Sequence, residues 1–259
     1  MRLYASNPPS WWPYWLVKPR GRGPGRRVES LIVDNGAFRF YQSGEYPLLD
    51  KWVLLIARSA LWLRGRAEEI YVILPDYPNE PSRTILAARK SKWLCKAYKC
   101  IVVMHYNTID RLELESLFET YMYDVDFVDL YAVPMKLPTS LYYSEKARRV
   151  VASPETQLKI AAIANNVAQR MNTRLHLLAP SLPVIRRLWA LRSIDSIDTT
   201  NWTRAIDAET KKKLGTISAR NKQEREQLFK HYLAKICRYV NKLEGWNCNE
   251  ETPFKPVSP

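Results

Sequence analysis

Three apolar segments of this 259-residue chain each end in an aspartate, at Asp34, Asp76 and Asp198. A β-branched run that ends in a carboxylate and then a turn is typical of a buried parallel strand. In a (β/α) barrel, the carboxyl ends of the strands form the face where active sites lie. Carboxylates gathered on that face predict glycosidic-bond chemistry, in which one acts as nucleophile and another transfers protons.

Each of these residues also has a structural interpretation. Asp34 precedes Asn-Gly and could be a simple turn residue, and Asp76 lies among prolines and could cap a loop. Asp195 and Asp198 are three positions apart, so on a regular strand they face opposite sides. We therefore assign the chemistry to Asp198 and a structural role to Asp195. His105 could be functional or could be a histidine packed at a strand end.

The elements that position these residues follow from the apolar pattern. Strands are expected at 3–6, 31–34, 70–75, 99–105, 126–133, 174–178 and 194–198, and helices at 47–64, from 81, from 108, at 153–171, 183–191 and 218–243. Thr108 and Ser153 are the expected caps of two of these helices. The alternation predicts a parallel sheet with crossover helices. Seven strands favour an α/β fold of the irregular (β/α)8 type with one strand not placed. An open doubly wound sheet is the alternative, but no Gly-rich phosphate loop follows the first strand.

The chain is expected to divide into a catalytic barrel over residues 1–205 and a C-terminal helical extension over 206–259, packed on the barrel as a long amphipathic helix. An aromatic and then basic loop occupies residues 8–27 of the barrel part. Its tryptophans, Trp11, Trp12 and Trp15, could stack on bases, but a hydrophobic plug for the barrel bottom is the favoured interpretation.

The formal net charge of +14 and the pI of about 9.6 are typical of a nucleic-acid-binding protein. The alternative is a basic, well-solvated surface without a specific partner. The candidates for contact with the nucleic-acid backbone are Arg20, Arg22, Arg26, Arg27, Lys211, Lys212 and Lys213.

The four cysteines, Cys95, Cys100, Cys237 and Cys248, form no CxxC pair and no cluster with histidine. They are expected to be reduced and mostly buried in a cytoplasmic protein, with a local Cys237–Cys248 disulfide as the alternative. The first residues show no secretory signal pattern, and no apolar run approaches the roughly 20 residues of a membrane span.

Four segments together resemble the tRNA-guanine transglycosylases. Residues 34–38, Asp-Asn-Gly-Ala-Phe, resemble their Asp-Ser-Gly-Gly-Phe motif, and residues 130–134, Leu-Tyr-Ala-Val-Pro, resemble their Gly-Leu-Ala-Val-Gly segment. Residues 177–183 resemble the strand and turn before their nucleophile. Residues 194–198, Ile-Asp-Ser-Ile-Asp, resemble their Val-Asp-Met-Phe-Asp, whose last aspartate attacks the sugar. Order and spacing agree from about residue 30 to 200.

This resemblance implies an irregular (β/α)8 barrel that exchanges a guanine in a polynucleotide for a 7-deazaguanine. Asp198 matches the nucleophile position and Asp34 the acid/base position. The positions implied to bind the base are Asp76, His105, Tyr131, Ala132, Val133 and Phe38. The backbone of residues 131–133 is implied to form the floor of the base pocket.

The sequence departs from that family after the nucleophile. The Cys-x-Cys-x-x-Cys…His zinc pattern of the tRNA enzymes is missing, since only Cys237 and Cys248 follow, so no zinc and no other cofactor is expected. Pro134 and Met135 replace a Gly-Glu pair that locks a 7-aminomethyl group.

Because it is compact and lacks the zinc pattern, this chain most resembles the branch of the same superfamily that inserts a base such as 7-cyano-7-deazaguanine into DNA. The expected partners are DNA and the 7-deazaguanine base, in the cytoplasm of a prokaryotic or virus-infected cell, with a homodimer or a partner chain left open. The alternatives are a minimal enzyme acting on tRNA, a non-catalytic barrel that binds nucleic acid, and a hydrolase or deoxyribosyltransferase acting on free nucleosides.

Overall fold

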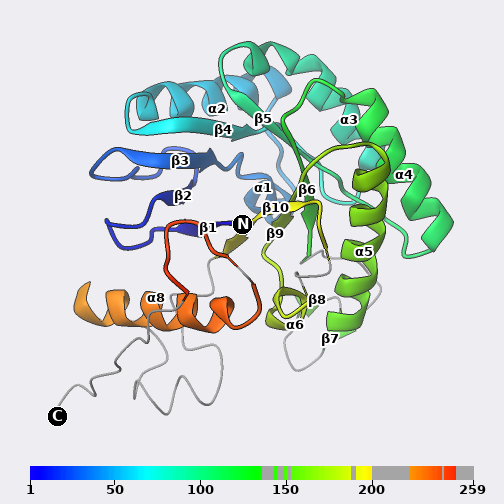
Figure 1. Cartoon of the computed structure of the whole chain (residues 1–259). Helices are drawn as coiled ribbons and strands as arrows, with labels where there is room; N and C mark the ends of the chain where they lie inside the picture. Colours follow the sequence, from blue (N-terminus) through cyan, green and yellow to red (C-terminus); the bar gives the residue numbers. More distant parts are fainter. Residues whose placement is uncertain are drawn as a thin grey trace.

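The computed structural model confirms the predicted α/β barrel, because eight parallel strands close on one another in the order β1-β10-β9-β6-β5-β4-β3-β2 (Figure 1). The strands are β1 (Arg2–Ser6), β2 (Tyr14–Val17), β3 (Val28–Val33), β4 (Ala67–Ile73), β5 (Lys99–Val103), β6 (Leu130–Pro134), β9 (Leu175–Leu178) and β10 (Ile194–Thr199). The structure describes residues 1–135, 143–144, 149–150, 153–187, 191–199, 222–240 and 242–248. Because all eight strands are parallel, their carboxyl ends meet at one mouth of the barrel.

Helices follow most of the strands, and Figure 1 shows α2 to α5 arranged from the top round to the right of the barrel, with α8 below. The helices are α1 (Ala37–Ser43), α2 (Leu49–Leu63), α3 (Pro81–Lys90), the 3-10 helix η1 (Lys92–Lys96), α4 (Arg111–Asp124), α5 (Pro154–Arg170), α6 (Leu182–Ile185) and α8 (Lys222–Cys237). Strands β7 (Tyr143–Ser144) and β8 (Arg149–Val150) form a separate antiparallel pair.

The helix caps follow local hydrogen bonding. Ser153 caps α5 as expected, accepting from the backbone N–H of Thr156 at 3.1 Å, with a proline in the first turn. The expected Thr108 cap of α4 is wrong, because the Asp110 carboxylate accepts from the first free N–H groups of that helix. Thr108 instead accepts from the backbone N–H of Asp110 at 3.1 Å, so it supports the capping residue.

Strand β2 is the strand that the sequence pattern misses. The connections on either side of it, residues 7–13 and 18–27, contain no helix and are shorter than the dozen or so residues of an ordinary crossover. Residues 8–27 show no alternating strand and helix pattern and are rich in proline and glycine, so the sequence predicts a single loop there. The strand nevertheless pairs in parallel with both β1 and β3 and completes the barrel.

An aromatic cluster lies between residues 7–13 and the C-terminal part of the chain. Trp12 is fully buried, with its ring 5.1 Å from that of Phe229 on α8, and Trp11 packs 5.8 Å from Trp246. These contacts favour the hydrophobic role of the tryptophans over base stacking. Together with α8, they cover strands that have no crossover helix of their own.

The last helix is shorter than expected, because α8 ends at Cys237 rather than at Leu243. Val240 and Leu243 are buried as the apolar pattern predicts, but they lie in an irregular segment that turns at Gly245. A side chain at Gly245 would meet Pro13, since a Cβ there would lie 2.6 Å from the proline Cγ.

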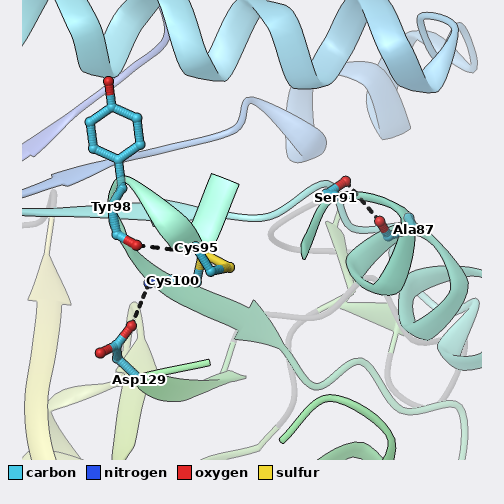
Figure 2. Close-up of a disulfide and its surroundings, with 6 residues drawn as sticks. All are labelled: Ala87, Ser91, Cys95, Tyr98, Cys100 and Asp129. Atoms are coloured by element: carbon cyan, nitrogen blue, oxygen red, sulfur yellow. Dashed lines mark hydrogen bonds between the residues drawn. A yellow bond between two sulfur atoms is a disulfide. The ribbon is translucent and has the colours of Figure 1, made fainter. Parts of the chain in front are cut away.

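All four cysteines are paired, which corrects the expectation of reduced thiols. Cys95 and Cys100 form a disulfide between η1 and β5, with their Cα atoms 5.4 Å apart (Figure 2). The Asp129 carboxylate accepts a 2.8 Å hydrogen bond from the backbone N–H of Cys100, drawn as a dashed line in Figure 2. Cys237 and Cys248 form the second disulfide, which is the alternative that the sequence leaves open.

Among the described residues, no helix combines the length and the apolar character that crossing a membrane requires.

The barrel interior contains polar side chains that hydrogen-bond to one another. Tyr4 and Ser30 share a 2.7 Å hydrogen bond between their hydroxyls, and His176 Nδ1 lies 2.9 Å from the Ser196 hydroxyl. Burial lowers the pKa of His176 to about 3, so this imidazole is neutral at physiological pH. At the amino ends of the strands, Glu69 pairs with Arg2 and Lys99.

Candidate active site at the carboxyl end of the barrel

Asp198 lies near the end of β10 and faces the barrel interior. It is the register partner of Tyr4 on β1, and Tyr4 reaches across the interior to Ser30 on β3. Paired residues on parallel strands point to the same side of the sheet, so Asp198 shares the side of Tyr4. The Asp198 side chain is buried, with 7% of the residue exposed.

The loop after β9 supplies a hydrogen-bond donor to Asp198. The backbone N–H of Ala179 donates to Asp198 Oδ1, and Ala179 has a left-handed backbone with φ of +50°. A non-glycine residue in this region costs on the order of 1 kcal/mol or more, so the surrounding contacts must hold it there. This N–H fixes the position of the Asp198 carboxylate, the group type that acts as nucleophile in glycosyl transfer.

Neighbouring residues fix the end of β10. The Tyr232 hydroxyl on α8 donates to Thr199 Oγ1 at 3.1 Å, so α8 packs against the segment that carries Asp198. Asp195 forms a 3.4 Å ion pair with Arg174 on the opposite side of the strand. The two aspartates of β10 thus face opposite sides of the strand, as their spacing predicts, and their roles stay a prediction.

Asp34 follows β3 and accepts a 3.1 Å hydrogen bond from the backbone N–H of Gly36. Gly36 has φ of +80°, a conformation that glycine adopts without strain, so the Asp-Asn-Gly sequence forms the tight turn that its residues favour. Burial raises the pKa of Asp34, and the nearby Asp76 raises it further, against the lowering effects of the Gly36 N–H and Lys18. Asp34 therefore keeps its proton to a higher pH than an ordinary aspartate.

Asp76, Asn35 and His105 form a buried network beside Asp34. The Asn35 Nδ2 donates to Asp76 Oδ1 and to the Leu74 carbonyl, the latter at 2.6 Å, and His105 Nε2 bonds to Asp76 Oδ2. All three polar residues are less than 5% exposed. The structure thus brings Asp34, Asp76 and His105 together at the ends of three neighbouring strands, β3, β4 and β5.

This network changes what Asp76 can do for a base. Both of its oxygens already accept a hydrogen bond, so a bound base would have to use the remaining lone pairs. His105 Nδ1 is buried and has no hydrogen-bond partner among the described residues. A buried nitrogen of this kind can serve as a further contact for a ligand. Sequence reasoning assigns no role to Asn35, although its position after Asp34 in a turn motif is a usable signal.

The residues of β6 that are predicted to form the pocket floor use their polar groups in contacts within the barrel wall. The Tyr131 hydroxyl donates to the Val125 carbonyl at 3.0 Å, on the α4 side of the strand. The Ala132 carbonyl accepts from the N–H of Met104 at 2.8 Å. Ala132 and Val133 are fully buried in the strand, so their backbone is a poor candidate for reading a base. Phe38, in contrast, is 57% exposed in the first turn of α1.

The predicted backbone-binding cations differ in their surroundings. Arg20, Arg22 and Arg27 are exposed on the loop between β2 and β3. Arg26 directs its guanidinium to the backbone carbonyls of Ser10 and Trp11, so it ties two loops together. Lys211, Lys212 and Lys213 lie outside the described residues.

The described residues contain no group of three or more histidine, cysteine or acidic side chains placed to hold a metal ion. Cys237 and Cys248 are joined to each other, so neither offers a thiolate ligand in this state. The expectation that the protein works without zinc or another cofactor stays a prediction.

No protein-family model and no curated protein matches this chain. Among solved structures, a presumed alpha-L-fucosidase from Bacteroides thetaiotaomicron matches with a TM-score of 0.38 and 8% sequence identity. The match covers 81% of this chain and 82% of that one. A similarity at this level assigns neither an activity nor a site residue.

Proposed function

We propose that this protein is a transglycosylase that exchanges guanine in DNA for a 7-deazaguanine base through a covalent aspartyl-sugar intermediate. One observation carries the proposal: Asp198 near the end of β10 and Asp34 directly after β3 lie at the same mouth of one barrel, and the pKa of Asp34 is raised. Asp198 accepts a backbone N–H, whereas burial and Asp76 raise the pKa of Asp34. A carboxyl group with a raised pKa can act as a general acid, and a second carboxylate at the same mouth can act as the nucleophile.

In the first step, Asp198 attacks C1′ of the target nucleoside. The new bond joins an Asp198 oxygen to C1′, and the bond from C1′ to the guanine nitrogen breaks. The electron pair of that bond leaves with guanine, which takes a proton from Asp34. The enzyme now holds the sugar on Asp198, and Asp34 is ionised.

In the second step, the incoming base replaces the enzyme. Its nitrogen attacks C1′ while Asp34 takes back a proton from the base, and the bond to Asp198 breaks. Asp34 and Asp198 return to their starting states, so no further reactant is needed. The two steps divide one difficult displacement into two easier ones.

Base selection is assigned to the Asp76 network. The free lone pairs of Asp76 face a guanine-like base as acceptors for its N–H groups, and His105 supplies a further nitrogen. Asn35 keeps the Asp76 carboxylate in place. A pocket built around fixed acceptors rejects bases that lack the matching donors, because its own groups would be left unpaired.

The choice of a polynucleotide over a free nucleoside rests on charge. A net charge of +14 serves an enzyme whose substrate carries a phosphate on each nucleotide. A free nucleoside has no phosphate and gains nothing from such a surface. The target base would have to leave its stack to reach the barrel mouth. The preference for DNA over tRNA rests on the resemblance to the compact, zinc-free branch.

Guanine exchange tests the proposal. Purified protein is incubated with duplex DNA or tRNA and with labelled guanine or 7-cyano-7-deazaguanine. Asp198→Asn is compared with Asp195→Asn, which removes a carboxylate from the opposite side of the same strand. We expect label in DNA with the wild type and with Asp195→Asn, and a loss of at least a thousandfold with Asp198→Asn.

Other outcomes are equally informative. Label in tRNA alone would move the protein to the tRNA-modifying branch and contradict the assignment to DNA. Equal exchange by Asp198→Asn and wild type would remove Asp198 as the nucleophile. Absence of label from both polynucleotides, with binding intact, would contradict the transglycosylase proposal and favour a binding protein.

A further inference from the structure

A basic groove lies between α2 and the loop of residues 18–27. It encloses about 620 Å³ and is lined by Arg20 from the loop and by residues of α2. The α2 residues that matter most are Lys51, Leu54, Arg58 and Trp62. Among the described residues that line the groove, three are cations and none is acidic.

The spacing of the α2 residues places them in one row. Positions 51, 54, 58 and 62 are three or four residues apart, which keeps them on one face of a helix. This face is solvent-exposed, whereas Trp52, Ile56 and Leu63 on the opposite face are buried. At 1.5 Å per residue, the row from Lys51 to Trp62 is about 16 Å long, which is the length of a few nucleotides.

The loop that forms the other wall is fixed against α2. Gly23 approaches the helix so closely that a Cβ there would lie 2.2 Å from Leu63 Cδ2. The backbone N–H of Arg20 donates to Ser59 Oγ at 3.3 Å, and Arg66 donates to the Pro24 carbonyl at 3.3 Å. These contacts hold the loop of residues 18–27 against α2 and define the groove between them.

Trp62 gives the groove an aromatic surface. It is 53% exposed, which is unusual for so large an apolar side chain, and the Arg66 guanidinium lies 4.5 Å from the centre of its ring. A cation on one side of the indole leaves a flat surface for stacking. Cations that follow a groove beside an exposed aromatic ring are the combination that binds single-stranded nucleic acid.

The groove begins next to the candidate active site. Pro19, directly before Arg20, approaches Gly36 of the Asp34 turn, because a Cβ on Gly36 would lie 3.5 Å from Pro19 Cγ. Trp52, beside Lys51 in the first turn of α2, donates from its indole N–H to the Asn35 carbonyl at 2.7 Å. Lys51 is therefore at the mouth end of the groove, Arg20 lies beside Ser59 further along α2, and Trp62 is at the far end.

We propose that this groove holds a polynucleotide strand that continues from the barrel mouth. Its phosphates lie on Arg20, Lys51 and Arg58, and one base stacks on Trp62. That the strand continues from the barrel mouth rests on the proposed function. Its binding to the groove does not. None of the three α2 residues belongs to the catalytic assignment.

Binding of a fluorescent single-stranded DNA of about 12 nucleotides tests the proposal, measured by anisotropy over a range of salt concentrations. Lys51→Gln/Arg58→Gln is compared with Lys90→Gln/Arg111→Gln, which removes the same charge from α3 and α4. We expect the groove variant to bind at least tenfold more weakly. Its salt slope should fall by about 1.4, the value for two lost phosphate contacts on a single strand. The control should lose less than threefold.

Trp62→Leu separates stacking from charge. It should weaken binding by roughly tenfold to a hundredfold, because one stacked base is lost, and leave the salt slope unchanged. Thermal unfolding of each variant shows whether the fold is intact. Equal losses of DNA affinity in the groove variant and in the charge control would overturn the proposal. So would unchanged binding by Trp62→Leu together with competition by a polysulfate as strong as competition by unlabelled DNA.

The two proposals fail separately. Loss of binding in the groove variants, without guanine exchange by the wild type, would keep the groove and remove the transglycosylase function. Normal strand binding by every groove variant, with guanine exchange by the wild type, would remove the groove and keep the function. The same oligonucleotide as RNA shows whether the groove distinguishes the sugar.

Discussion

Asp34 and Asp198 are the same residue type, yet different neighbours hold them at the barrel mouth. The backbone N–H of the left-handed Ala179 donates to Asp198, whereas burial and a neighbouring carboxylate raise the pKa of Asp34. Sequence reasoning selects both residues from their positions after apolar runs. It does not select Ala179 or Asn35, because a backbone N–H and an amide that orients another side chain have no sequence pattern.

The raised pKa of Asp34 predicts a pH dependence of stability. The folded state binds this proton more tightly than the unfolded chain, so the free energy of unfolding falls as pH rises from about 3.9 through the raised value. Asp34→Asn removes the ionisable group and keeps an oxygen for the Gly36 N–H. We expect the variant to be more stable than wild type at pH 7 and equally stable near pH 3, by urea denaturation. A variant that is less stable across the whole range would contradict this.

The Asn35 side chain predicts a large effect from a small truncation. Asn35→Ala leaves the Leu74 carbonyl and one Asp76 oxygen without their donor in a buried place. We expect the free energy of unfolding to fall by about 2–3 kcal/mol, the cost of buried groups left unpaired. Asn166→Ala, at an exposed position of α5, is the matched control. Equal stability of the two variants by chemical denaturation would show that the network contributes little.

At the scale of elements, the sequence predicts most strands and helices because each has its own apolar period. It misses β2 because the flanking connections, residues 7–13 and 18–27, are too short for helices and are rich in proline and glycine. It extends α8 beyond Cys237 because Val240 and Leu243 stay buried in an irregular segment. The spacing of apolar residues indicates which side chains are buried. It does not distinguish a helix from an irregular segment whose apolar side chains are equally buried.

The packing of residues 18–27 on α2 predicts the effect of two glycine substitutions. Gly23→Ala places a Cβ 2.2 Å from Cδ2 of the buried Leu63, whereas a Cβ at Gly25 meets nothing within 4 Å. We expect Gly23→Ala to lower the free energy of unfolding by about 1–3 kcal/mol through overpacking. Gly25→Ala should change it by less than about 0.5 kcal/mol. Thermal unfolding of the pair measures the difference, and equal values would mean that the loop is not packed as described.

At the scale of the whole molecule, the net charge can be read from the sequence, whereas the disulfide pairing and the closure of the barrel cannot. The net charge of +14 predicts a polyanionic partner from the sequence alone. The pairing of Cys95 with Cys100 could not be predicted from spacing, because it depends on η1 turning back beside β5. Barrel closure likewise depends on a strand that carries no alternating pattern.

The two disulfides predict the thiol content of the purified protein. Unfolding without reductant should expose no reactive thiol, because all four cysteines are paired. Reduction before unfolding should release four. A colorimetric thiol titration distinguishes these results, and four reactive thiols without reductant would restore the expectation of reduced cysteines.

The central claim is that Asp198 forms a covalent bond to the sugar of a nucleic acid. The most direct measurement is denaturing electrophoresis and mass spectrometry of protein quenched with acid during turnover on a guanine-containing DNA. We predict a protein–DNA adduct that maps to Asp198 in the wild type, persists in Asp195→Asn and is missing in Asp198→Asn. An adduct of equal yield in Asp198→Asn, or one that maps to another residue, would contradict the claim.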